Sequence, residues 1–438
     1  MTSPVYHIEK LVHGGLGLSH NENKQKTLIE GVISGETVTA KIQSMGKKHN
    51  TAVAKSIIQP SPERIQAPCQ YYKQCGGCDF QHMSYPRQLQ EKQAILKDLL
   101  LQSGNSILQE AATKTLTEPL ASPSQTHYRQ RIRLQVDDKQ TLGFHKRRSH
   151  DCIAIDSCLL ATPKINDCLQ QLLPQSIFNK LLRQTEALEI LFNPDSSTLT
   201  LLIHFKRKPR PADKQHAQDL INTIPELKNI FFIGDGFPVT GHTSLSFSLP
   251  PLAPHTSKTL QLSLETGSFC QVNVEQNTQL VKTVLNFCMV SREDDVLDLF
   301  CGMGNFSIPL AEQAKSVWGV EGQGSAIRSA RKNSAHAGQD NTLFKKQAIH
   351  TACSELAQAG NIFDCIVLDP PRQGAPGLAR VLSALCTKRM VYISCDPSTL
   401  CRDLTDLLQH GFIIKKLQPI DMFPQTHHIE TVVLLEKA

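Results

Sequence analysis

The C-terminal part of the chain, from about residue 267, alternates apolar strand-like segments with helical segments. Such alternation predicts a mainly parallel, doubly wound sheet of the α/β class. The expected strands are 295–300, 316–320, 363–368, 390–394, 413–417 and 431–435. Because sheets of this kind bind ligands at the carboxyl ends of their strands, the residues after each strand are the candidates for a functional site.

A glycine turn follows the first of these strands, in Cys301-Gly-Met-Gly-Asn-Phe306. Its glycines let the backbone approach a ligand closely, and Glu321, which ends the next strand, can accept hydrogen bonds from ribose hydroxyls. The third glycine of Gly-x-Gly-x-x-Gly is absent, which argues against a dinucleotide. A lone Gly-x-Gly is typical of many ordinary turns. Together with Asp298 and Glu321, however, this one resembles the S-adenosylmethionine site of class I methyltransferases.

Three further motifs stand at the ends of later strands. They are Asp369-Pro-Pro-Arg-Gln-Gly374, Tyr392-Ile-Ser-Cys-Asp-Pro-Ser-Thr-Leu400 and Asp421-Met-Phe-Pro-Gln-Thr-His-His-Ile-Glu430. The second motif puts Cys395 on a turn that faces the ligand crevice. A helix that starts at Pro397 would favour the thiolate form of this cysteine.

A thiol and a carboxylate at neighbouring strand ends suit the methylation of carbon 5 of uracil. Addition of the Cys395 thiolate to carbon 6 would convert the ring to an enolate, which can attack a methyl sulfonium. Glu430 would then remove the carbon-5 proton so that the thiol can leave, and a donor near the uracil carbonyl would stabilise the enolate. Taken singly, a buried inert cysteine, a strand-end glutamate and a surface-paired Arg372 are the better explanations. The three motifs together favour the chemistry.

These motifs resemble those of the RNA uracil-C5 methyltransferase family, and the resemblance covers nearly the whole chain. It implies that Cys395 is the nucleophile and Glu430 the base. The residues that it implies for methyl-donor binding are Gln271, Phe300, Asn305, Glu321 and Asp369. A family position that is often Asn falls near Gln347-Ala348 and stays unassigned. Asp396 replaces the commoner Asn after the nucleophile, which leaves the cysteine itself in place.

The resemblance also implies three domains. Residues 1–60, with short β-rich segments at 6–11, 27–33, 37–42 and 51–57, are expected to form an OB-fold-like β-barrel of the TRAM type that binds RNA. Residues 61–266 are expected to form a central α+β domain, whose helix near 87–102 is a candidate to pack on the catalytic domain. Residues 267–438 are the expected methyltransferase domain.

A cysteine cluster opens the central region. Cys69, Cys75 and Cys78 have the spacing C-x5-C-x2-C, so a distant fourth cysteine would complete a Cys₄ site for zinc or an iron–sulfur cluster. Spacing alone leaves zinc open and leaves Cys152 or Cys168 as possible fourth ligands. The family resemblance implies a [4Fe–4S] cluster with Cys158 as the fourth ligand, as in the bacterial 23S ribosomal RNA branch. Such a cluster is expected to be structural or RNA-organising, because methyl transfer moves no electrons.

Charge and hydropathy bear on partners and compartment. The net charge is +6, too mild to identify a partner, so local clustering has to decide. The N-terminus lacks the apolar run of a secretory signal, and no apolar stretch is long enough to span a membrane, so the protein is predicted to be cytoplasmic, with no membrane partner. Its 14 cysteines are then not expected to form disulfides.

Basic residues gather in two places that suggest RNA. The first group, with the rings of Tyr128 and Phe144 interleaved, suits phosphates and stacked bases, and the second is equally typical of a solvated face. The first group is Arg129, Arg131, Arg133, Lys146, Arg147 and Arg148, and the second is Lys206, Arg207, Lys208 and Arg210. The target base must leave its stack to meet Cys395, which favours a loop of RNA.

The leading hypothesis is transfer of a methyl group from S-adenosylmethionine to carbon 5 of a specific uridine in 23S rRNA, by a monomeric enzyme. A tRNA uridine-C5 methyltransferase is the nearest alternative. A cytosine-C5 RNA methyltransferase shares the cysteine chemistry, but the Asp-Pro-Pro-Arg and Phe-Pro-x-Thr motifs argue against it. A catalytically silent RNA-binding or iron–sulfur module is disfavoured because Cys395, Glu430 and the glycine turn are all intact.

Overall fold

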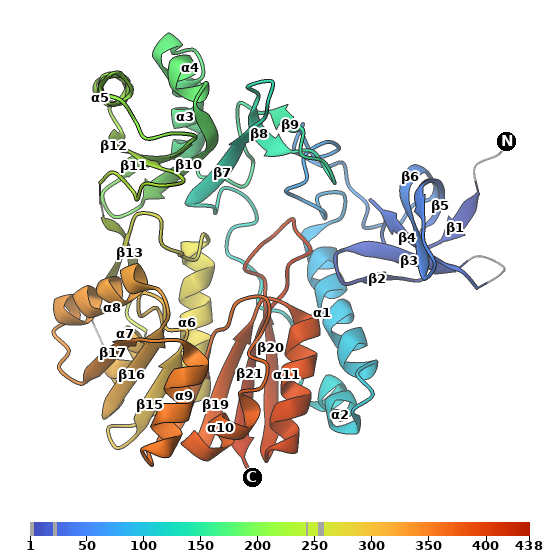
Figure 1. The fold of residues 1–438 in the computed structure, drawn as a ribbon. Helices are drawn as coiled ribbons and strands as arrows, with labels where there is room; N and C mark the ends of the chain where they lie inside the picture. Colours follow the sequence, from blue (N-terminus) through green and yellow to red (C-terminus); the bar gives the residue numbers. More distant parts are fainter. Residues whose placement is uncertain (1–3, 21–23, 242–243, 253–257) are drawn as a thin grey trace.

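The C-terminal strands form one seven-stranded sheet in the computed structural model, which describes residues 4–20, 24–241, 244–252 and 258–438. The strand order is β17-β16-β15-β18-β19-β21-β20 (Figure 1). Its strands are β15 (Asp295–Leu299), β16 (Ser316–Glu321), β17 (Thr342–Lys346), β18 (Phe363–Leu368), β19 (Cys386–Ser394), β20 (Phe412–Ile420) and β21 (Glu430–Lys437). β15 to β19 pair in parallel, whereas β21 is antiparallel to both neighbours. The chain order reverses between β15 and β18, where sheets of this kind bind ligands.

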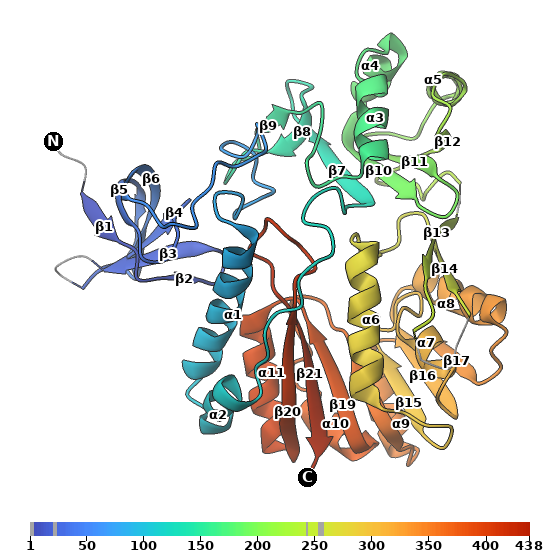
Figure 2. The ribbon, with the colours of Figure 1, turned by 180° about the vertical axis from the view of Figure 1, so that it is seen from behind.

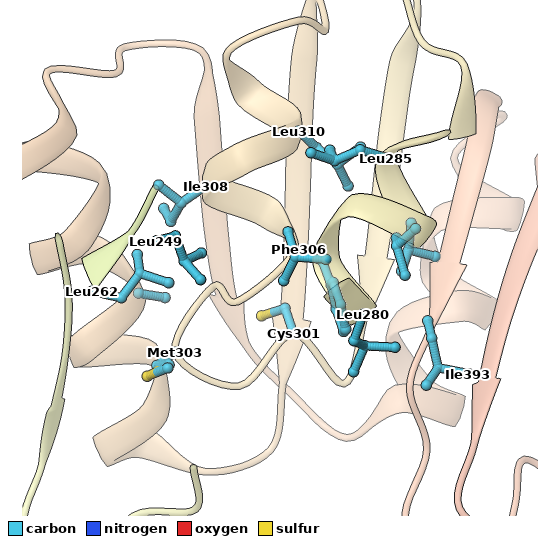
Figure 3. Packing of buried hydrophobic residues seen from close by; sticks show 14 of the residues in the cluster. Leu249, Leu262, Leu280, Leu285, Cys301, Met303, Phe306, Ile308, Leu310 and Ile393 are labelled. Atoms are coloured by element: carbon cyan, nitrogen blue, oxygen red, sulfur yellow. The ribbon is translucent and has the colours of Figure 1, made fainter. Parts of the chain in front are cut away.

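Helices cover both faces of this sheet (Figures 1 and 2). α6 (Val274–Cys288), α7 (Ser307–Ala311) and α8 (Gly324–Ala337) contribute to one buried apolar cluster, together with a hairpin of β13 (Ser244–Leu249) and β14 (Leu260–Glu265). In Figure 3, Leu249 and Leu262 of the hairpin lie near Ile308 of α7. The other face carries α9 (Ile349–Gln358), α10 (Ala379–Leu385) and α11 (Pro397–Gln409). The predicted doubly wound arrangement is confirmed.

A second sheet, of order β12-β11-β10-β7-β8-β9, lies above the carboxyl edge of the first (Figure 1). Its strands are β7 (Arg131–Val136), β8 (Leu142–His145), β9 (Cys152–Ala154), β10 (Thr185–Asn193), β11 (Thr198–Phe205) and β12 (Leu227–Ile233). The helices α3 (Pro163–Leu172), α4 (Ser176–Leu182) and α5 (Pro211–Thr223) share its apolar core. Leu188, Ile190, Leu201 and Ile203 contribute buried side chains from its central strands.

A third sheet, of order β1-β5-β6-β4-β3-β2, contains the N-terminal strands. These are β1 (Val5–His7), β2 (Lys10–Val12), β3 (Leu16–His20), β4 (Lys26–Glu30), β5 (Thr37–Met45) and β6 (His49–Gln59). The single strand expected at 6–11 is wrong. The segment is divided into two strands at opposite edges of the sheet: β1 pairs with β5, and β2 pairs with β3. Between them the chain turns at Ile8, whose N–H donates to the carbonyl of Glu36.

Two helices link the N-terminal part of the chain to the catalytic sheet. α1 (Tyr85–Leu101) and α2 (Ser106–Lys114) share the apolar cluster of α9 to α11. α1 also buries Lys92, whose ammonium donates to Asp421 at 2.6 Å and to the carbonyl of Phe423 at 3.1 Å. The segment between β20 and β21 is therefore anchored to α1 by a buried ion pair.

Two features of the catalytic region escaped the sequence prediction. β17 reads Thr-Leu-Phe-Lys-Lys and buries only Phe344, because it is an edge strand with little apolar signal. The β13–β14 hairpin was also missed, although its residues alternate between the core and the surface. No helix among the described residues is both long and apolar enough to cross a membrane.

The Lys92–Asp421 ion pair gives a stability prediction. Lys92→Ala leaves the Asp421 carboxylate buried without its cation, so we expect the free energy of unfolding to fall by about 3–5 kcal/mol. Lys114→Ala is the matched control, because Lys114 and its partner Glu110 are exposed on α2, and it should leave stability unchanged. Urea unfolding of the full chain measures both, and equal midpoints for the two variants would contradict the prediction.

Candidate active site

A pocket of about 660 Å³ opens at the reversal point of the seven-stranded sheet. It lies at the carboxyl ends of β15, β16, β18 and β19, beside the start of β21. The residues predicted for methyl-donor binding and catalysis all line it: Gln271, Phe300, Asn305, Glu321, Asp369, Cys395 and Glu430. The structure thus brings together seven side chains that are spread over 160 positions of the sequence.

The glycine turn after β15 shapes the floor of the pocket. Phe300 has a φ of 61°, a conformation that non-glycine residues seldom adopt and that clusters at functional sites. Gly302 (φ 55°) has open space where a Cβ would stand. A ligand can therefore approach the backbone closely at this point. Asn305 and Asn277 of α6 donate to each other, at 2.8 and 3.0 Å, which fixes the Asn305 amide at the rim.

Buried acids give the pocket a negative potential. Burial, helped by the Asp369 and Glu321 carboxylates, raises the pKa of Asp298 to about 7. Burial alone raises the pKa of Asp369 to about 7. One oxygen of Asp298 accepts a hydrogen bond from Ser307 at 2.5 Å, and the other has no partner among the described residues. Glu321 also lines the pocket, and its Oε1 atom accepts from the Gln323 N–H at 2.8 Å, which leaves Oε2 for a ligand. A cationic ligand with ribose hydroxyls fits this site.

Cys395 lies on the turn between β19 and α11, as predicted, but its thiolate is not favoured. Burial, followed by the Glu430 and Asp369 carboxylates, raises the pKa of Cys395 to about 12. The expected help from the start of α11 is lost because Asp396 caps that helix. Its carboxylate accepts from the N–H groups of Ser398 and Thr399 at 3.0 and 2.9 Å.

Glu430 is the first residue of β21 and is 4% exposed. Burial, followed by the charge of Asp369, raises the pKa of its carboxyl group well above the usual value. Burial and nearby carboxylates therefore favour the protonated forms of both Cys395 and Glu430. Any process that starts here must bring positive charge into the pocket to ionise them.

Two of the sequence motifs are joined by Asp403 of α11. Its carboxylate accepts from the Tyr392 hydroxyl at 2.6 Å and from the Ala375 N–H at 2.7 Å. A side chain at Gly374 (φ 73°) would collide with this carboxylate. The Asp-Pro-Pro-Arg loop is thereby held against the strand that carries the cysteine.

The sequence prediction missed two further residues of the pocket. Arg129 was assigned to an RNA surface, yet it lines the pocket, and its buried Nε has no partner among the described residues. His428 also lines it, and burial, then His427 and Arg372, lowers the pKa of His428 to about 3, so the ring is neutral. The tyrosine–arginine strand and the His-His pair were visible in the sequence, but nothing there showed which way these side chains face.

The cysteines of the predicted cluster come together on one side of the central sheet. Cys69, Cys75 and Cys78 lie in a loop. These three cysteines and Cys158 are close enough for their charges to affect one another's thiol pKa values. Asn166 holds Cys158 through bonds to its N–H and its carbonyl, at 2.8 and 3.1 Å. No group of His, Cys, Asp or Glu side chains within the described residues has the arrangement of a formed metal site.

The donor chemistry nevertheless fits a thiophilic metal or cluster. Burial, then the charges of other cluster cysteines, raises the pKa of Cys75 and of Cys78, the latter to about 12, and bound metal would offset this repulsion. The alternative fourth ligands lie elsewhere. Cys168 of α3 is buried in the apolar core, and the Cys152 sulfur is 4.0 Å from the Nδ1 atom of His145.

A second pocket, of about 730 Å³, lies between the N-terminal sheet, the cysteine loop and β8. The Gly14-Gly15 turn forms one wall, and the opposite wall carries Phe144 and basic side chains. The basic side chains are Arg133, Lys146, Arg147 and Arg148. The other predicted basic group behaves differently, since Arg207 pairs with Asp213 at 2.7 Å next to α5.

Comparisons with known proteins identify the family of this chain. A sequence model of the family described as tRNA (Uracil-5-)-methyltransferase matches residues 84–438. The Shewanella sediminis protein described as 23S rRNA (uracil(1939)-C(5))-methyltransferase RlmD is 35% identical over 98% of this chain and 95% of its own length. A Vibrio cholerae protein of the same description is 33% identical, with 98% and 95% covered.

A solved structure supports the fold over the same length. It is the Pyrococcus abyssi tRNA (uracil-54, C5)-methyltransferase in complex with S-adenosyl-L-homocysteine. It matches with a TM-score of 0.73 over 98% of this chain and 99% of its own, at 22% identity. Topology and site together define an S-adenosylmethionine-dependent α/β methyltransferase. The chain belongs to the tRNA (Uracil-5-)-methyltransferase family.

The buried Asp298 makes the stability of the ligand-free protein depend on pH. Its folded pKa of about 7 lies above the ordinary value of 3.8, so its penalty is absent below pH 4 and grows as the pH rises to about 7. Asp298→Asn should remove this dependence and stabilise the protein at pH 8, by at most about 4 kcal/mol at ~1.4 kcal/mol for each pH unit.

Thermal unfolding between pH 4 and pH 8 measures this effect. Asp295→Asn is the control, because Asp295 lies in the same strand but pairs with Lys315 at 3.0 Å near the surface. It should give no gain at pH 8. Parallel pH profiles for Asp298→Asn and the unaltered protein would show that Asp298 is ionised without penalty.

Proposed function

We propose that this protein transfers a methyl group from S-adenosylmethionine to carbon 5 of a specific uridine in 23S rRNA, giving 5-methyluridine. The observation that carries the proposal is the convergence of Cys395 and Glu430 in one pocket with the acid-lined glycine turn. Relatives described as 23S rRNA (uracil(1939)-C(5))-methyltransferases match nearly the whole chain, which supports 23S rRNA as the substrate.

The methyl donor would lie along the glycine turn. Glu321 would accept from the ribose hydroxyls, and Gln271, Phe300 and Asn305 would surround the rest of the molecule. Asp369 would stand between the donor and the uracil, since its charge acts on both Cys395 and Glu430. The donor supplies an electrophilic methyl group on a positively charged sulfur.

Positive charge in this pocket would activate the nucleophile. A cation beside Asp369, together with Arg372, lowers the pKa of Cys395 and so favours the thiolate. The thiolate then adds to carbon 6 of the uracil, and carbon 5 of the resulting enolate takes the methyl group. We assign the Arg129 guanidinium as the donor to the enolate oxygen, because its buried Nε has no partner among the described residues.

The same charge would control the base. Glu430 must be ionised when it accepts the carbon-5 proton, and the cationic donor favours that form before transfer. Methyl transfer removes the positive charge, so the high pKa of the buried Glu430 carboxyl group returns just when a proton has to be taken up. The bond between carbon 6 and sulfur then breaks, and Cys395 leaves.

The RNA would cross the second pocket on its way to Cys395. Its basic wall suits phosphates, and Phe144 offers a ring on which an unpaired base can stack. We assign residues 1–60 as a TRAM-type, OB-fold-like RNA-binding domain, 61–266 as the central domain and 267–438 as the catalytic domain. The target uridine would be turned out of a loop into the pocket. The enzyme is proposed to act as a monomer in the cytoplasm.

Trapping experiments test the two catalytic roles. RNA with 5-fluorouridine at the target should form a covalent adduct in the presence of the methyl donor, because fluorine cannot leave as a proton. Cys395→Ala should abolish this adduct, whereas Cys401→Ala, a change to a partly buried cysteine on α11, should not.

Loss of the base should have the opposite effect to loss of the nucleophile: with ordinary uridine RNA the covalent adduct should accumulate. Glu430→Gln should accumulate a methylated adduct and lower turnover by roughly 10²- to 10⁴-fold, because the carbon-5 proton has no acceptor. Denaturing gels with labelled methyl donor measure adduct and product. An adduct that survives in Cys395→Ala, or normal turnover in Glu430→Gln, would refute the mechanism.

We also propose that Cys69, Cys75, Cys78 and Cys158 hold a [4Fe–4S] cluster. Four thiols without other donors favour iron–sulfur or zinc over harder metals. Protein purified without oxygen should contain about four iron atoms per chain and absorb in the visible blue region. Cys158→Ser should lose the iron, and Cys168→Ser should keep it. Stoichiometric zinc without iron would reject the cluster.

The tRNA alternative has support of its own, because the Pyrococcus abyssi structure of the same fold is described as a tRNA methyltransferase. Mapping of 5-methyluridine in both RNAs from cells that lack the protein separates the two substrates. Loss from 23S rRNA alone supports the proposal, and loss from tRNA alone favours the alternative.

A further inference from the structure

The cysteine loop and the segment before Glu430 are directly hydrogen-bonded to each other. The N–H groups of Asp79 and Phe80 both donate to the carbonyl of Gln425, at 3.0 Å each. Asp79 follows Cys78, and Gln425 stands five residues before Glu430. Two regions that are about 350 positions apart in sequence therefore share one junction.

The Asp79 carboxylate is the side-chain centre of this junction. One oxygen accepts from the Nδ1 atom of His427 at 2.6 Å and from the His427 N–H at 3.3 Å. The other oxygen accepts from Arg147 at 3.3 Å, and Arg147 also donates to the carbonyl of Cys78. Asp79 and His427 have side-chain exposures of 20% and 28%, so water competes little for these bonds.

The position of Glu430 depends on this segment. No hydrogen bond within the described residues holds the Glu430 carboxyl group, so its backbone has to set its place. The segment 421–429 contains no helix or strand, and Gln425 has a φ of 71°. The His427 ring lies 4.4 Å from the ring of His428, which lines the catalytic pocket. Asp79 therefore fixes His427 only three residues before the proposed base.

We propose that Asp79 is a positioning residue for the removal of the carbon-5 proton, and that it acts through His427 on the segment that carries Glu430. This inference rests on the proposed function of Cys395 and Glu430. The cysteine loop would then have two separate roles. Its cysteines would bind the proposed cluster, and the Asp79 carboxylate would hold the catalytic segment through His427. The chemical step affected is the last one, after the methyl group has reached carbon 5.

Asp79→Ala tests the inference in the full-length, iron-loaded protein. We expect turnover to fall about tenfold, a part of the roughly 10²- to 10⁴-fold that a positioned base supplies. Asp79 and its partner Arg147 also line the second pocket, so the KM for RNA is expected to rise as well. The positioning role is read from the fall in kcat and from a methylated covalent adduct left by ordinary uridine RNA, as with Glu430→Gln. Asp79→Asn, which keeps an oxygen acceptor for His427, should recover part of the loss. Asp151→Ala, which removes a more exposed carboxylate near the same loop, is the control and should behave like the unaltered protein.

Two readouts separate positioning from a general structural role. Iron content and visible absorbance should be unchanged in Asp79→Ala, and hydrogen exchange of the backbone amides of 425–430 should become faster. Normal turnover without adduct overturns the inference, as does a loss of iron together with an equal loss of RNA binding. If the unaltered protein makes no 5-methyluridine, the proposed function fails. The exchange measurement then still decides whether Asp79 holds the segment.

Discussion

A group of carboxyl side chains buried at the carboxyl edge of the seven-stranded sheet is the constraint on which the site depends. Asp298, Asp369 and Glu430 all have raised pKa values, and burial is the first cause in each case. Such a site is costly when it is empty and favourable when a cation enters. A positive charge that enters this pocket would therefore favour the ionised forms of these carboxyl groups and of Cys395.

The segment between β20 and β21 is bonded to several parts of the chain that are distant in sequence. α1 holds it through Lys92 and Asp421, and Gln88 bonds to Gln425 in both directions. The Tyr128 hydroxyl donates to the carbonyl of Pro424 at 3.0 Å, so the residues just before β7 hold the segment as well. A segment without regular structure is therefore held from several sides, and Glu430 follows directly. Buried polar bonds of this kind keep a loop in one conformation because each broken bond leaves an unsatisfied group.

Much of the catalytic region was predictable from sequence. Periodicity located six strands of the large sheet, because their buried residues form nearly continuous apolar runs. The edge strand β17 was lost for the converse reason, since only Phe344 is buried in it. The fourth cysteine also needed more than spacing. Spacing left Cys152, Cys158 and Cys168 open, and the family resemblance favoured Cys158, which the fold places close enough to Cys69 for their charges to interact.

The sequence by itself determined which chemistry this protein carries: a cysteine and a glutamate at strand ends, and a glycine turn followed by an acid. These follow from local motifs, whose residue types and backbone conformations are set by near neighbours in the chain. Only the tertiary structure decided the ionisation of those groups. The Asp396 carboxylate caps the start of α11, and burial, followed by the Glu430 and Asp369 carboxylates, raises the pKa of Cys395. Electrostatic energy depends on distance and burial in space, which separation along the chain does not encode.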